Sequence, residues 1–172
     1  PDSSRVGLLV LRLDRFDSIT GGFGPAVGEE VLRQIGRRLR ASRPADDLVA
    51  RTGGAEFAVL VEGVGAEGCS GIARRTQHLL EEPVRAGGRD LAVTCAIGVA
   101  LAESGIDTAE ELLRAGEEAL HSARISGRSR WATFDQAMRA HSVSQATLEL
   151  ELRGALRRHD ITLAFQPVVT LG

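Results

Sequence analysis

The sequence has no lysine and no tyrosine, and aromatic side chains make up only 3% of its 172 residues. All of its basic residues are therefore arginines, and the net charge of −2 argues against a surface that binds nucleic acid. So few aromatics also exclude a sheet that stacks RNA bases. No apolar run is long enough to cross a bilayer, and no secretory signal opens the sequence. We therefore expect a cytoplasmic domain without a membrane segment.

Cysteine is scarce as well, with Cys69 and Cys95 the only two. They lie far apart and lack the spacing of metal ligands. This usage predicts two reduced, small core residues in a cytoplasmic protein.

Apolar runs and helical spacings alternate along the first 135 residues. The pattern predicts strands over 5–13, 47–52, 57–61, 91–101 and 131–134, and helices over 25–40, 66–81 and 109–124. Glycines at 21, 22 and 24 predict a flexible connection, and residues 83–90 predict a small hairpin. Thr108, with Glu111 three residues later, predicts a capping box. The order is βαββαβ with an added α–β pair, which indicates an α+β sheet flanked by helices.

The character of the chain changes after residue 135. Residues 138–158 predict one long helix, and residues 161–169 (ITLAFQPVV) predict a strand with no partner nearby. We therefore expect a domain over 1–135, a linker helix over 136–160 and the first strand of a second domain over 161–172.

The most informative stretch is the hairpin RTGGAEFAVLVE, residues 51–62. Its glycine pair, Gly53-Gly54, can take positive φ and lets a ligand or another backbone approach closely. Glu56 places a carboxylate at the mouth of this turn. A glycine hairpin carrying an acid is compatible with a purely structural role. The full pattern, ending in Phe57, resembles the signature of the GGDEF family, the diguanylate cyclases, except that Ala55 replaces an acid.

Further motifs extend this resemblance over about residues 5–134, without the family's opening helix. They are LDRF at 13–16, DLVAR at 47–51, AIGV at 96–99, ALHSAR at 119–124 and GRSR at 127–130. The resemblance implies a nucleotidyl-cyclase-like fold. FQPVV at 165–169 is similar to the opening of the EAL family, cyclic-di-GMP phosphodiesterases built as β/α barrels.

The GGDEF resemblance also implies two GTP-bound domains face to face, with two metal ions stabilising the charge that develops during phosphoryl transfer. The metal carboxylates of the family correspond to Arg12 and Ala55. An arginine beside a divalent ion turns attraction into repulsion, so we expect neither bound magnesium nor catalysis from the altered signature at Gly53, Gly54, Ala55, Glu56 and Phe57. Arg12 either pairs with Glu56 across the hairpin or holds a phosphate in place of the metal.

The family's nucleotide contacts are altered too. The two guanine-reading positions correspond to Thr20 and Glu29, and a phosphate-reaching lysine corresponds to Asp17. Arg124 and Arg128 match basic phosphate-contacting positions, although arginines also suit the end of a helix. At the family's inhibitory product site, Pro44 replaces the arginine while Asp47 remains.

Three functions compete on this reading. The first, which we favour, is a catalytically inactive domain that regulates or dimerises an adjoining EAL phosphodiesterase in bacterial cyclic-di-GMP signalling. The second is a domain that binds GTP as an allosteric effector. The third is an active cyclase with an unusual metal arrangement. The expected partners are the EAL domain of the same chain, a second copy, and GTP.

Overall fold

The computed structural model describes residues 6–102, 106, 108–127, 130–135, 138, 151, 154–158 and 160. They form an α+β domain, as predicted. Its strands are β1 (Val6–Leu13), β2 (Leu48–Gly53), β3 (Glu56–Glu62), β4 (Val84–Ala86), β5 (Arg89–Leu91), β6 (Cys95–Leu101) and β7 (Trp131–Thr133). Its helices are α1 (Phe16–Phe23), α2 (Pro25–Ala41), α3 (Ala66–Glu81) and α4 (Ala109–Ile125).

The main sheet has five strands in the order β2-β3-β1-β6-β7. The apolar strand β1 lies at its centre and pairs antiparallel with both β3 and β6. Strand β7 pairs parallel with β6, while β4 and β5 form the separate small hairpin expected from the sequence. Arg12 at the end of β1 faces Glu56 at the start of β3, so the register places these two residues side by side.

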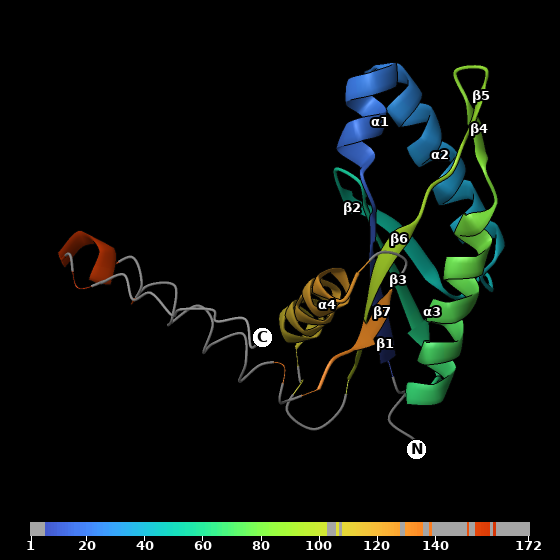
Figure 1. The fold of residues 1–172 in the computed structure, drawn as a ribbon. Coiled ribbons are helices and arrows are strands. Elements are labelled where there is room, and N and C mark those ends of the chain that lie inside the picture. The colour runs from blue at the N-terminus through green and yellow to red at the C-terminus, as the bar shows by residue number, and fades with distance from the viewer. Residues whose placement is uncertain are drawn as a thin grey trace, which may run out of the picture.

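Helices cover both faces of this sheet (Figure 1). Alternate residues of β1 point to opposite faces, as the two-residue period of a strand requires. Leu9 and Leu11 join a core with α2 and α3, and Leu8 and Val10 join a second core with α4. The capping box predicted at Thr108 is present at the start of α4.

The glycine-rich segment predicted as a flexible connection is instead helix α1. Glycine at 21 and 22 costs about 1 kcal/mol each in a helix interior, and tertiary packing offsets that cost. A Cβ on Gly28 of α2 would lie 2.5 Å from Thr20 Cγ2 and 3.1 Å from the Phe16 ring, so the two helices meet closely there. Gly24, at φ 90°, makes the turn between them.

The strand predicted over 91–101 starts only at Cys95, and Leu91 belongs to the small hairpin. The last strand pair between β1 and β6 joins Leu13 to Cys95, and just beyond it the Asp14 main-chain N–H donates to the Thr94 carbonyl at 2.8 Å. Here too, long-range pairing decides a boundary that the apolar pattern cannot show.

The predicted linker helix is described only in part. Residues 138, 151 and 154–158 are helical. The rest of that helix, Arg128 and the strand predicted over 161–169 lie outside the described residues. No helix in the described part of the chain is long and apolar enough to span a membrane.

Candidate functional site

The site predicted from the signature lies where β1 ends beside the β2–β3 turn. The main-chain N–H of Leu13 donates to the carbonyl of Ala55 at 3.0 Å, which fixes the turn against β1. Gly54 has φ 47°, the left-handed conformation that glycine adopts without strain. The conformation of Gly54 and the hydrogen bond from the end of β1 therefore determine the shape of this corner.

Arg12 and Glu56 form an ion pair at this corner. Arg12 Nη1 lies 3.2 Å from Glu56 Oε1, and the two side chains are 43% and 36% exposed. This pairing was one of the two alternatives predicted for Arg12. The position at which the resemblance implies a metal carboxylate thus carries a guanidinium that is paired with an acid.

The other residues at the corner do not supply the ligands of a metal site. Ala55 packs its methyl group against the core and offers no oxygen ligand from its side chain. Asp14 Oδ2 accepts a hydrogen bond of 2.6 Å from Thr94 Oγ1. Within the described residues, no group of three or more histidine, cysteine, aspartate or glutamate side chains could hold a metal ion. The donor set does not fit a magnesium pair.

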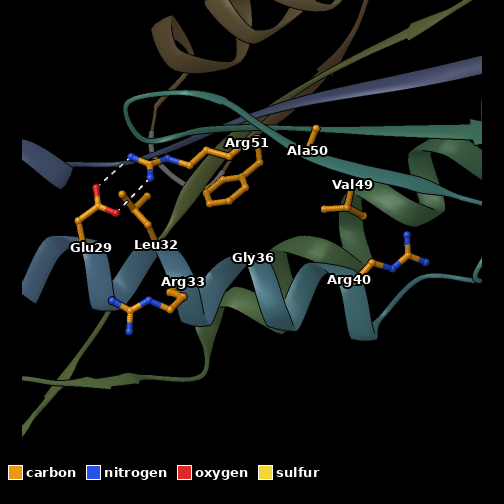
Figure 2. Close-up of a pocket in the computed structure, with 9 residues that line it drawn as sticks. Glu29, Leu32, Arg33, Gly36, Arg40, Val49, Ala50 and Arg51 are labelled. Carbon is orange, nitrogen blue, oxygen red and sulfur yellow. Dashed lines mark hydrogen bonds and ion pairs between the residues drawn. The ribbon is translucent and has the colours of Figure 1, made fainter.

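The two predicted guanine-reading residues are engaged within the chain. Thr20 Oγ1 donates to the carbonyls of Phe16 and Asp17 in its own helix, at 3.3 and 3.1 Å. Both carboxylate oxygens of Glu29 lie 3.2 Å from the Arg51 guanidinium (Figure 2). Arg51 also donates from Nε to the Gly54 carbonyl at 3.0 Å.

Arg51 is the functional candidate that the sequence reading missed. It opens the signature pattern, yet Glu29 precedes it by 22 residues, and opposite charge alone does not select one partner among many. The fold makes the pairing by laying the N-terminal half of α2 beside β2. The Arg51–Glu29 bridge thus ties the hairpin to α2.

A groove of about 320 Å³ runs between α2 and β2 (Figure 2). Its lining combines an apolar floor with charged rims: Glu29, Leu32, Arg33, Gly36, Arg40, Val49, Ala50, Arg51 and Phe57. A second hollow, of about 370 Å³, lies beside α1. It is lined by Asp14, Arg15, Ser18, Ile19, Phe23, Ala92 and Thr94.

The remaining predicted positions lie apart from this corner or outside the described residues. Asp47 is held by Arg43, with Nη2 2.5 Å from Oδ2, and the two side chains are only 12% and 11% exposed. The carbonyl of Pro44 accepts a hydrogen bond from Arg40. Arg124 is exposed in the last turn of α4, and Arg128 is not described.

Residues 1–130 match the family model described as "Diguanylate cyclase, GGDEF domain". The chain belongs to the GGDEF family. Its fold and its membership of this family, both expected from the motifs, are thus confirmed. Within the GGDEF domain the signature reads Gly53-Gly54-Ala55-Glu56-Phe57.

Characterised relatives share this region at moderate identity. The "Bifunctional diguanylate cyclase/cyclic di-GMP phosphodiesterase MucR" of Pseudomonas aeruginosa is 29% identical over 168 residues, which cover 98% of this chain and 24% of the relative. The "Cyclic di-GMP phosphodiesterase NbdA" of the same species is 30% identical over 166 residues, covering 96% and 21%. The chain spans less than a quarter of the length of either relative.

Solved structures agree with the fold. The GGDEF domain of YfiN (TpbB) from Pseudomonas aeruginosa superposes with a TM-score of 0.73 at 31% identity, covering 78% of this chain and 84% of that domain. The five-stranded sheet and its helices are therefore those of a GGDEF domain.

Proposed function

We propose that this GGDEF domain does not synthesise cyclic di-GMP and instead regulates an adjoining EAL phosphodiesterase. The observation that carries the proposal is the ion pair between Arg12 and Glu56. A cyclase of this family needs two divalent cations where this chain presents a fixed positive charge and a methyl group. The one acid left in the signature, Glu56, already neutralises that positive charge.

The magnitudes support inactivity. Two unit charges 4 Å apart interact by about 4 kcal/mol at an effective dielectric near 20, and a divalent ion doubles this to about 8 kcal/mol. Replacing a carboxylate by a guanidinium reverses the sign, and salt screens only part of the penalty at a half-exposed site. Glu56 and Asp14 would have to overcome that repulsion while giving up their own partners.

The competing role, a GTP-binding effector, has weaker support. A guanine base would have to displace Arg51 from Glu29 and draw the Thr20 hydroxyl away from its helix. Asp17 adds a negative charge in the first turn of α1, where a triphosphate would be repelled. The geometry favours a domain whose ligand positions are filled by its own side chains.

The phosphodiesterase half of the proposal rests on the tail and on the relatives. Residues 165–169 are similar to the start of an EAL domain, and NbdA is named as a cyclic di-GMP phosphodiesterase. We therefore keep the division into a GGDEF domain over 1–135, a linker helix over 136–160 and the beginning of an EAL domain over 161–172.

A two-sided assay on the full-length protein tests catalysis. With GTP and magnesium we expect neither cyclic di-GMP nor its hydrolysis product from the natural protein, measured by chromatography. The double change Arg12→Asp and Ala55→Asp restores both carboxylates and should raise magnesium binding. Product from the natural protein above the background without enzyme would refute inactivity.

Regulation needs a separate measurement. Deleting residues 1–135 from the full-length protein should change the rate of cyclic di-GMP hydrolysis or the oligomeric state. If hydrolysis and sedimentation are the same with and without the domain, the regulatory role is wrong even if the domain is inactive.

A further inference from the structure

Strand β2 forms one edge of the main sheet, and no other described strand pairs with its outer side. An unpaired edge presents a row of main-chain donors and acceptors that a second extended chain can use. Natural edges are commonly protected by lysine, proline or inward-pointing charge. The segment Leu48–Gly53 has no lysine or proline, and its first residue, Leu48, is 59% exposed.

The groove between α2 and β2 runs along this same edge. Val49 and Arg51 share a face with Val59 and Phe57, their partners across the hairpin. Phe57 and Leu32 supply an apolar floor, and Gly36 of α2 lines the groove without a side chain. A Cβ added at Gly36 would touch the Phe57 ring at 3.5 Å. An apolar side chain from an added strand therefore has a place to insert.

The charges that line the groove favour an acidic partner. Its lining holds three arginines and one glutamate. Arg51 is occupied by Glu29, and Arg40 donates to the main-chain carbonyls of the α2–β2 loop. Arg33 has neither a hydrogen bond nor an ion pair with any residue that the structure describes, and it is exposed at the rim. A guanidinium that stays charged at all working pH values and has no internal partner suits a carboxylate.

From this combination we propose that the β2 edge and the α2–β2 groove bind an extended acidic peptide segment of a partner protein. The segment adds a short strand along β2, packs an apolar side chain beside Val49 and places a carboxylate on Arg33. The Arg51–Glu29 bridge closes one end of the groove, so the peptide lies along its middle. The inference does not require the domain to be inactive.

The test uses the 172-residue chain and a defined probe, a capped octapeptide of alternating valine and glutamate. We expect saturable binding by NMR titration, with shifts at the amides of β2 and slower hydrogen exchange at those on its outer side. Arg33→Glu should weaken binding about tenfold, because it replaces an attraction by a repulsion at an exposed site. Arg74→Glu, the same charge change on the exposed face of α3, should leave affinity unchanged.

Three results would overturn the inference. One is the absence of binding at millimolar peptide. Another is equal binding of a peptide N-methylated along one edge, which cannot extend a sheet. The third is protection of the outer β2 amides in the free protein that rises with protein concentration, since this would assign the edge to a second copy of the chain.

Discussion

Arg12 and Glu56 are both more than a third exposed, so solvent screens the attraction between them. We therefore expect Arg12→Ala to lower the free energy of unfolding by no more than about 1 kcal/mol, measured by urea denaturation. Arg43→Ala is the comparison, because it strips a nearly buried carboxylate, Asp47, of its partner and should cost about 2 kcal/mol. A larger loss of unfolding free energy from Arg12→Ala than from Arg43→Ala would show that the exposed pair contributes more to stability than the nearly buried one.

The buried thiol of Cys95 makes the stability of the fold depend on pH. Burial, with a smaller contribution from the charge of Asp14, raises the pKa of its thiol from 9.0 to about 12. Between these values the unfolded chain loses a proton that the folded chain keeps, so the stability of the fold decreases as pH rises above about 9. Denaturation at pH 8 and pH 10 should show a smaller loss in Cys95→Ala than in the natural protein.

Reaction with a thiol reagent checks the burial of Cys95 independently. Both cysteines are buried and free, and burial also raises the pKa of Cys69. At pH 8 a disulfide reagent should modify neither thiol until denaturant is added. Rapid reaction of Cys95 in the native protein would be inconsistent with its burial in the sheet.

Single residues also show how far the sequence could be read. The Arg12–Glu56 pair was predictable because the family resemblance places the end of the first strand beside the signature hairpin, although 44 residues separate the two side chains. The Arg51–Glu29 bridge was not, because it depends on how α2 lies across the sheet. The motifs of the resemblance bring together two strand ends far apart in the sequence, whereas no motif reports the contact between α2 and β2, which needs the tertiary packing.

At the scale of elements, α4 packs tightly against β6. A Cβ on Gly98 would lie 2.1 Å from the Gly116 carbonyl oxygen and 2.2 Å from the Leu120 nitrogen. Since both are main-chain atoms, α4 would have to move away, and we expect Gly98→Ala to cost about 3 kcal/mol or more in urea denaturation. In Gly21→Ala the new methyl meets nothing within 4 Å, and this variant should be more stable by about 0.5–1 kcal/mol.

That second variant also bears on the element that the sequence reading missed. Gly21 and Gly22 lower the helix propensity of α1 enough to make the segment read as a connection. The helix forms because Phe16 and Ile19 pack against the main core and Thr20 meets Gly28. If Gly21→Ala were destabilising instead, α1 would need backbone freedom that its helical conformation does not suggest.

At the scale of the whole molecule, the order of elements and the family were readable because several separate motifs agree. Apolar strands, the capping box at Thr108 and the glycine hairpin all occur within the 130 residues that match the family. The altered site could be recognised from the sequence as a set of substitutions relative to the family signature. Regulation of an adjoining domain belongs to the proposed function, and the deletion of residues 1–135 tests it.

Ligand-dependent stability tests the domain as one unit. Because Thr20, Glu29 and Glu56 already have partners in the chain, GTP and magnesium should leave its melting temperature unchanged within about 1 °C. A ligand at 100 times its dissociation constant would add about 2.7 kcal/mol and raise the melting temperature by several degrees.

ATP is the matched control for nonspecific polyphosphate effects. A rise of several degrees with GTP and none with ATP would support the effector role instead, because base recognition would then have displaced Arg51 from Glu29. The same rise only in the Arg12→Asp, Ala55→Asp double variant, and only with magnesium, would show that these two residues decide whether the domain binds GTP with magnesium.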